Sequence, residues 1–113
     1  MRMDYAERYN RNRVSWLYAL ARSEKVGSNA VRVGLLFATF FNAEEREILK
    51  PSYTWIMEAA HIKSRTSLRK ALLELEQSGF LIIDRMHRYN NEYRMPFDGE
   101  ANWAGPLSPE NGL

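Results

Sequence analysis

The 113-residue chain contains no cysteine, and this absence removes several classes of protein at once. Without thiols there is no disulfide scaffold, zinc ribbon, iron–sulfur centre or thiol nucleophile. The chain also has no apolar run approaching the roughly 20 residues that cross a bilayer. Its first ten residues, MRMDYAERYN, carry charges where a secretory signal has an apolar segment. We therefore expect a cytoplasmic protein with no membrane segment.

Motifs of catalysis and metal binding are scarce as well. The chain has neither a Gly-x-Ser-x-Gly elbow nor a glycine-rich phosphate loop. Glu58 and His61 have the spacing of two ligands on one helix face, but metal sites of this kind draw further ligands from other helices. The other histidine, His87, falls in an expected hairpin turn. We expect no enzymatic activity, no metal and no cofactor.

The charge of the chain is nearly balanced overall but unevenly distributed. The net charge is +2, with +3 in residues 1–25, −1 in 26–60, +3 in 61–95 and −3 in 96–113. Two basic blocks indicate a surface that faces a polyanion. The alternative is that these charges only solvate helix faces.

Proline and glycine gather at the C-terminal end. Residues 96–113 hold three of the four prolines and three of the six glycines. This composition predicts a flexible acidic tail over 97–113, with Trp103 exposed in it. The remaining residues, 1–96, are enough for a single domain that needs no covalent crosslink.

The first half of this domain predicts two helices. Between residues 5 and 25 apolar side chains recur at helical spacing, at Val14, Leu17 and Ala21 with Trp16 and Leu20 beside them, and no proline interrupts. Ser28 or Asn29 then caps a second helix that is apolar all round, as expected of a central helix. Its aromatic residues are expected in the core, namely Phe37, Phe40 and Phe41. A short strand is predicted at Ile48-Leu49.

The second half predicts two more helices and a hairpin. Ser52 caps the helix YTWIMEAA, whose inward face is expected at Trp55, Ile56 and Ala59. Ser64 caps RTSLRKALLELEQS, where Leu68, Ala71, Leu72 and Leu75 have core spacing and Gly79 supplies a left-handed stop. His61 in the intervening turn tolerates a left-handed φ better than a β-branched residue does. FLIIDRM and EYRM are predicted strands around the turn HRYNN.

Two short helices joined by a tight turn and followed by a hairpin describe a winged helix-turn-helix. The expected fold is therefore mainly α with a small β-hairpin, a winged helix-turn-helix with an extra N-terminal helix. The helix over 65–78 would be about 21 Å long and would enter a major groove about 12 Å wide.

The candidate DNA-binding residues lie on that helix and in the hairpin turn. On the helix and at its cap they are Ser64, Arg65, Thr66, Ser67, Arg69 and Lys70. Of the helix residues, Arg65, Thr66, Arg69, Lys70 and Leu73 are expected to face away from the core. Arginine can contact guanine O6 and N7 together, and Arg69 is the first choice for a base contact. In the turn they are Arg85, Arg88, Tyr89, Asn90 and Asn91, where a wing meets phosphates or the minor groove.

The segment PSYTWIMEAAHIKSRTSLRKALLELEQSGFLIIDRMHRYNNEYRM resembles the winged helix-turn-helix domains of bacterial, plasmid and phage regulators and replication initiators. The matching positions are Pro51-Ser52, Lys70-Ala71-Leu72, Glu74-Leu75, Gly79 and Asn91-Glu92-Tyr93-Arg94-Met95. With its helical lead-in, the resemblance covers roughly residues 14–96.

The resemblance implies binding of double-stranded DNA, in transcription regulation or in DNA replication or maintenance of a mobile element. A homodimer through the N-terminal helix is expected, because one recognition helix covers only a few base pairs. Tyr5 and Tyr9 interleave with arginines there and suit a dimer interface or a nucleic-acid strand. The alternative function is a protein–protein interaction adaptor or inhibitor that does not bind DNA. No small-molecule ligand is evident.

Overall fold

A computed structural model of the chain describes residues 5–40 and 48–96. Within these ranges the elements are α1 (Tyr5–Arg22), α2 (Ser28–Phe40), β1 (Ile48–Leu49), α3 (Tyr53–Ala60), α4 (Arg65–Gln77), β2 (Ile82–Asp84) and β3 (Glu92–Arg94). The prediction of a mainly helical chain with a small antiparallel hairpin is confirmed. The predicted tail over 97–113 lies outside the described residues, as does Phe41.

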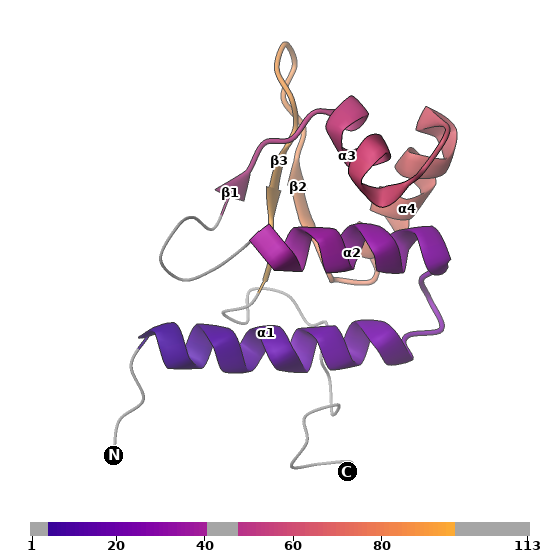
Figure 1. The fold of residues 1–113 in the computed structure, drawn as a ribbon. Helices are drawn as coiled ribbons and strands as arrows, with labels where there is room; N and C mark the ends of the chain where they lie inside the picture. The colour runs from indigo at the N-terminus through magenta and orange to yellow at the C-terminus, as the bar shows by residue number, and fades with distance from the viewer. Residues whose placement is uncertain (1–4, 41–47, 97–113) are drawn as a thin grey trace.

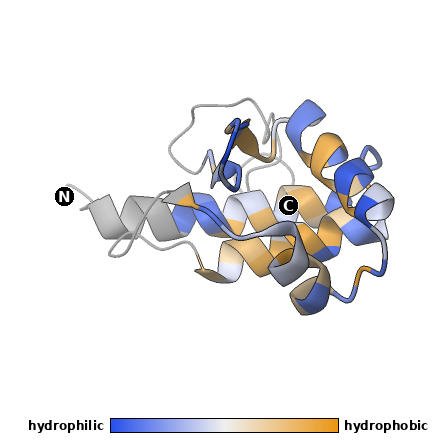
Figure 2. Cartoon of the chain, turned by 90° about the horizontal axis from the view of Figure 1, so that it is seen from above, coloured by the Kyte–Doolittle hydropathy of each residue, from blue (hydrophilic) through white to orange (hydrophobic). Residues whose placement is uncertain are grey.

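Helix α2 is the centre of the fold. Helix α1 lies along one side of it, while α3, α4 and the hairpin lie on the opposite side (Figure 1). Side chains of α1 pack closely on α2 at Gly34, since a Cβ there would stand 2.8 Å from Leu20 Cδ2. In Figure 2 hydrophobic residues gather in the middle of the molecule and hydrophilic ones toward its outer parts.

Helix α1 is attached to the rest of the domain through Trp16. The Trp16 side chain is fully buried, its Nε1 donates to the Phe80 carbonyl at 3.0 Å, and its ring meets that of Phe80 edge to face at 5.6 Å. The inward face of α1 is therefore Trp16, Ala19 and Leu20. Among the other apolar residues of α1, Leu17 packs half-buried against the core, whereas Val14 is 61% exposed and Ala21 is exposed, because α1 is covered on one side only.

The predicted core is wrong at Phe40 and, on α3, at Trp55 and Ala59, while Ile56 is buried as predicted. Helix α3 packs inward through Ile56 and Ala60, which leaves Trp55 and Ala59 on its outer side. Trp55 is 40% exposed and meets Phe40, 44% exposed, edge to face at 5.5 Å. Ile56 and Ala60 are four residues apart and so lie on one face of α3, and Trp55 and Ala59 lie together on the adjacent face. Phe37 is buried as expected.

The turn between α3 and α4 forms as the capping residues predict. Ser52 accepts from the Trp55 amide and Ser64 from the Ser67 amide, both at 3.1 Å. His61 has a left-handed backbone with φ of 57°, and the next amide, Ile62 N, donates to the Met57 carbonyl at 2.9 Å. Gly79 ends α4 with φ of 81°. The sequence signals for both helix starts and both stops are confirmed.

Three short strands form one antiparallel sheet in the order β1-β3-β2. Tyr93 of the central strand pairs with Leu49 on one side and Ile83 on the other. Its ring is buried 5.1 Å from Phe37, which joins the sheet to α2. None of the described residues hydrogen-bonds the Tyr93 hydroxyl, and burial raises its pKa to about 12, with the nearby Asn91 amide opposing the rise only in part.

Among the described helices, none combines the length and the hydropathy that spanning a bilayer requires.

The raised pKa of Tyr93 predicts loss of stability in alkali. The folded state keeps this proton up to about pH 12, whereas the unfolded chain releases it near the ordinary tyrosine value of about 10. Unfolding therefore becomes easier as pH rises from about 10 to about 12. Urea unfolding across this pH range is expected to show a fall in the free energy of unfolding of the wild type, and a smaller fall in Tyr93→Phe. An identical fall in both proteins would contradict the assignment to Tyr93.

Candidate nucleic-acid interface

The exposed side of α4 is set by the side that it buries. Leu68, Ala71, Leu72 and Leu75 are all buried against the core, in the spacing that the sequence predicts. The residues between them face solvent, namely Arg65, Thr66, Arg69, Lys70 and Leu73. Ser64 is exposed too, and its hydroxyl donates to the half-buried Ser67 hydroxyl at 2.9 Å. The predicted outward orientation of Arg65, Thr66, Arg69, Lys70 and Leu73 is confirmed.

The charges of α4 run against its helix dipole. The first half carries Arg65, Arg69 and Lys70, and the first turn has no acidic residue. The acidic residues, Glu74 and Glu76, lie in the second half, and the last turn has no basic residue. Since a helix is stabilised by acids at its N-terminus and bases at its C-terminus, this order opposes stability. It concentrates positive potential at one exposed end, where backbone amides also point outward.

Lys70 stands where the start of α2 meets α4. A hollow of about 250 Å³ lies here, lined by Gly27, Ser28, Asn29, Ser67, Lys70, Ala71 and Glu74. The Glu74 carboxylate accepts from the Gly27 amide at 2.7 Å and so fixes the loop before α2 to α4. Lys70 is therefore presented beside a rigid junction.

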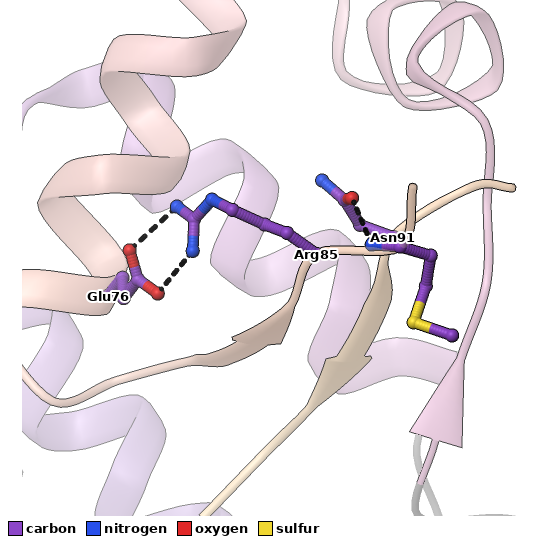
Figure 3. A network of polar contacts seen from close by, with 4 residues as sticks. Glu76, Arg85 and Asn91 are labelled. Carbon is purple, nitrogen blue, oxygen red and sulfur yellow. Dashed lines mark hydrogen bonds and ion pairs between the residues drawn. The ribbon is translucent and has the colours of Figure 1, made fainter. Parts of the chain in front are cut away.

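Arg85, predicted as a DNA contact, is bound to α4. Both of its terminal nitrogens donate to the Glu76 carboxylate at 2.8 Å, in a fork geometry (Figure 3). This hydrogen bonding lowers the pKa of Glu76 and raises that of Arg85. Glu76 thus offsets much of the charge that Arg85 would offer a phosphate, and the predicted contact stays a prediction.

The two asparagines of the hairpin turn have partners within the chain. Asn91 Oδ1 accepts from the Met86 amide at 3.3 Å (Figure 3), and Asn90 Nδ2 donates to the Lys50 carbonyl at 3.2 Å. Lys50 Nζ lies 3.4 Å from the Glu92 carboxylate. These contacts shape the turn and fix it to the end of β1. Arg88 and Tyr89 are left to project, and Tyr89 is 78% exposed.

The two predicted groups share one side of the molecule. Helix α4 and the hairpin turn both lie across α2 from α1 (Figure 1). Within the described range, Glu76 of α4 and Arg85 after β2 join them directly. The interleaved tyrosines at the start of α1, predicted to form a dimer interface, lie among residues whose side chains the structure does not describe.

Sequence reasoning missed three contributors to this surface. Glu76 and Glu74 hold Arg85 and Gly27, and Tyr53 lies under Arg65 with 5.6 Å between the ring centroid and the guanidinium carbon. Each pair joins separate elements, so no spacing along one helix indicates it. The one relevant signal in the sequence was the order of charges along α4, with the cations in its first half and the glutamates in its second.

Comparison of the chain with protein-family models, curated proteins and solved structures found no match. The arrangement of its side chains is therefore the basis for assigning a function.

The Arg85–Glu76 pair predicts a modest, acid-sensitive contribution to stability. Glu76→Gln is expected to lower the free energy of unfolding at neutral pH by at most about 1 kcal/mol, because both side chains are partly exposed. A carboxyl with a lowered pKa stabilises the fold above its unfolded pKa, and the effect is lost as pH falls through the folded value. Urea unfolding of wild type and Glu76→Gln at neutral and acid pH measures this contribution to the free energy of unfolding.

The control is Glu58→Gln, an exposed glutamate on α3. The difference in the free energy of unfolding between wild type and Glu76→Gln should become smaller at acid pH, whereas the difference between wild type and the control should show no comparable change. A pH-independent difference for Glu76→Gln would contradict a charge-based role.

Proposed function

We propose that the domain is a winged helix-turn-helix that binds duplex DNA without catalysing a reaction. In this proposal α3 and α4 are the helix pair, α4 enters the major groove, and the turn between β2 and β3 is the wing. The order of helix, helix and hairpin supports it, as does the common side on which α4 and the turn lie (Figure 1).

The observation that carries this proposal is the placement of Arg65, Arg69 and Lys70. They project from the end of α4 where the helix dipole is already positive, so their position weakens the isolated helix. Phosphate oxygens at this end would satisfy both the side chains and the first-turn amides that Ser64 does not cap. Recognition helices use their N-terminal residues for base contacts, which suits the same three side chains.

The wing supports the helix in this proposal. Arg88 and Tyr89 project from a turn that is fixed to α4 by Arg85 and to β1 by Asn90. Arg88 is assigned to a phosphate, which gives affinity without sequence preference, and Arg69 to a base edge. Arg69→Ala is therefore expected to cost about 1–3 kcal/mol at selected sites, and Arg88→Ala to weaken all duplexes alike.

The biological role that fits is transcription regulation, or replication or maintenance of a mobile element, in the cytoplasm. A homodimer through α1 would double the length of DNA that is read. A second candidate is a protein–protein adaptor that binds no DNA. The exposed aromatic pair of Phe40 and Trp55, which lines an open apolar hollow of about 370 Å³, favours it.

A mobility-shift assay with random duplex separates the two candidates. Phosphate contacts predict that affinity falls by about 0.9 log units per log unit of salt for each phosphate neutralised. Arg88→Ala should reduce this slope by about one, whereas Arg22→Ala, which removes an exposed arginine from α1, should leave it unchanged. Absence of binding even at about 50 mM salt would favour the adaptor.

The charge order of α4 predicts opposite effects on stability and binding. Thr66→Glu adds an acid to the first turn, and it is expected to raise the free energy of unfolding by about 0.3–1 kcal/mol while weakening DNA binding severalfold. Urea unfolding and duplex titration measure the two effects. The control is Gln77→Glu, an identical charge change at the exposed far end of α4, expected to leave binding nearly intact. Equal losses of binding in both variants would contradict this interface.

A further inference from the structure

We propose that Tyr53 is a positioning residue for Arg65, holding its guanidinium in the orientation that meets acceptor oxygens and nitrogens of DNA. This inference rests on the proposed function and extends it to a residue outside the recognition helix. Tyr53 is the first residue of α3 and Arg65 the first of α4, so each stands directly after its serine cap.

The geometry is that of a cation over an aromatic face. The Arg65 guanidinium carbon lies 5.6 Å from the centroid of the Tyr53 ring. Tyr53 is half-buried and packs against the hydrophobic core, whereas Arg65 is exposed. The ring is thus the fixed partner and the arginine the mobile one.

A ring restrains an arginine without using its hydrogen-bond donors. A guanidinium attracted to an aromatic face keeps its N–H groups at the edge of its plane, where guanine O6 and N7 or phosphate oxygens bind. An unrestrained arginine loses rotamer entropy on binding. Part of that loss already occurs in the DNA-free protein if the ring holds the side chain.

Arg85 shows a different way in which this fold holds an arginine. Its two terminal nitrogens donate to the Glu76 carboxylate, and the same donors are then withdrawn from any ligand. The first turns of α3 and α4 contain no acidic residue that would hold Arg65 in this way. The ring also offsets the unfavourable position of a cation at a helix N-terminus. Arg65 is therefore restrained and still available.

The experiment is a double-mutant cycle on duplex binding by the full chain. Tyr53→Leu is expected to weaken binding about 3- to 5-fold, and Tyr53→Phe, which keeps the aromatic face, to stay within about twofold of wild type. In the Arg65→Ala background, Tyr53→Leu should have no further effect. The same loss in both backgrounds would mean that Tyr53 supports the fold only, and it would overturn the proposal.

A random duplex and a duplex selected from a pool identify the acceptor. If Tyr53→Leu lowers the affinity for the two duplexes equally, Arg65 contacts a phosphate. If it lowers the affinity for the selected duplex more, Arg65 contacts a base. Either result supports the positioning role.

A measurement without DNA keeps this inference separate from the proposed function. The Nε–Hε resonance of Arg65 should show a ring-current shift in wild type and Tyr53→Phe, and Tyr53→Leu should remove it. An unchanged resonance in Tyr53→Leu would overturn the positioning role even where DNA binds. Failure of the wild type to bind any duplex would overturn the proposed function and this inference together, whatever the resonance shows.

Discussion

The contact between the leucine face of α4 and the central helix α2 decides the rest of this structure. With Leu68, Leu72 and Leu75 buried, the rotation of α4 about its axis is fixed, and so is the set of side chains that reach solvent. Rotation of the helix about its axis in either direction would bury a charged side chain, Arg65 on one side or Glu74 on the other. The positive end of α4 is therefore a consequence of packing, and its exposure is as secure as the core itself.

Three arginines in this fold illustrate how the surroundings determine what an identical side chain does. Arg85 is held by a carboxylate and stabilises the link between the hairpin and α4. Arg65 rests on a ring that leaves its donors unused. Arg22 donates to its own helix neighbour Tyr18 at 2.8 Å, on the far side of the domain. Composition alone counts these as equal positive charges, whereas the structure gives them separate roles.

Features that depend on neighbours in the sequence were predictable here. The serine caps at Ser52 and Ser64 and the left-handed residues His61 and Gly79 are local, so a few residues specify each of them. The buried face of α4 was also predictable, since its leucines allow a single register. By contrast, α1 has apolar residues on more than one side, and only its contact with α2 selects Trp16 over Val14.

Contacts between elements that are distant in the sequence could not be predicted, because they depend on how those elements pack together. Glu76 and Arg85 are nine positions apart across a turn, and Trp16 and Phe80 are sixty-four apart, so their meeting depends on the completed fold. The candidate site was predictable as a list of exposed cations on α4. Which of those cations have intramolecular partners was not, because that depends on the relative placement of α3, α4 and the hairpin.

The hairpin turn is fastened at two places, to α4 through Glu76 and to β1 through the Lys50 carbonyl. Its tip cannot move toward or away from a ligand without breaking one of these contacts. The distance between α4 and the tip is therefore set before a ligand binds. For a duplex bound as proposed, the adjustment falls on the nucleic acid, which must narrow a groove or curve. Flexible base steps would then be favoured over stiff ones at positions that no side chain touches.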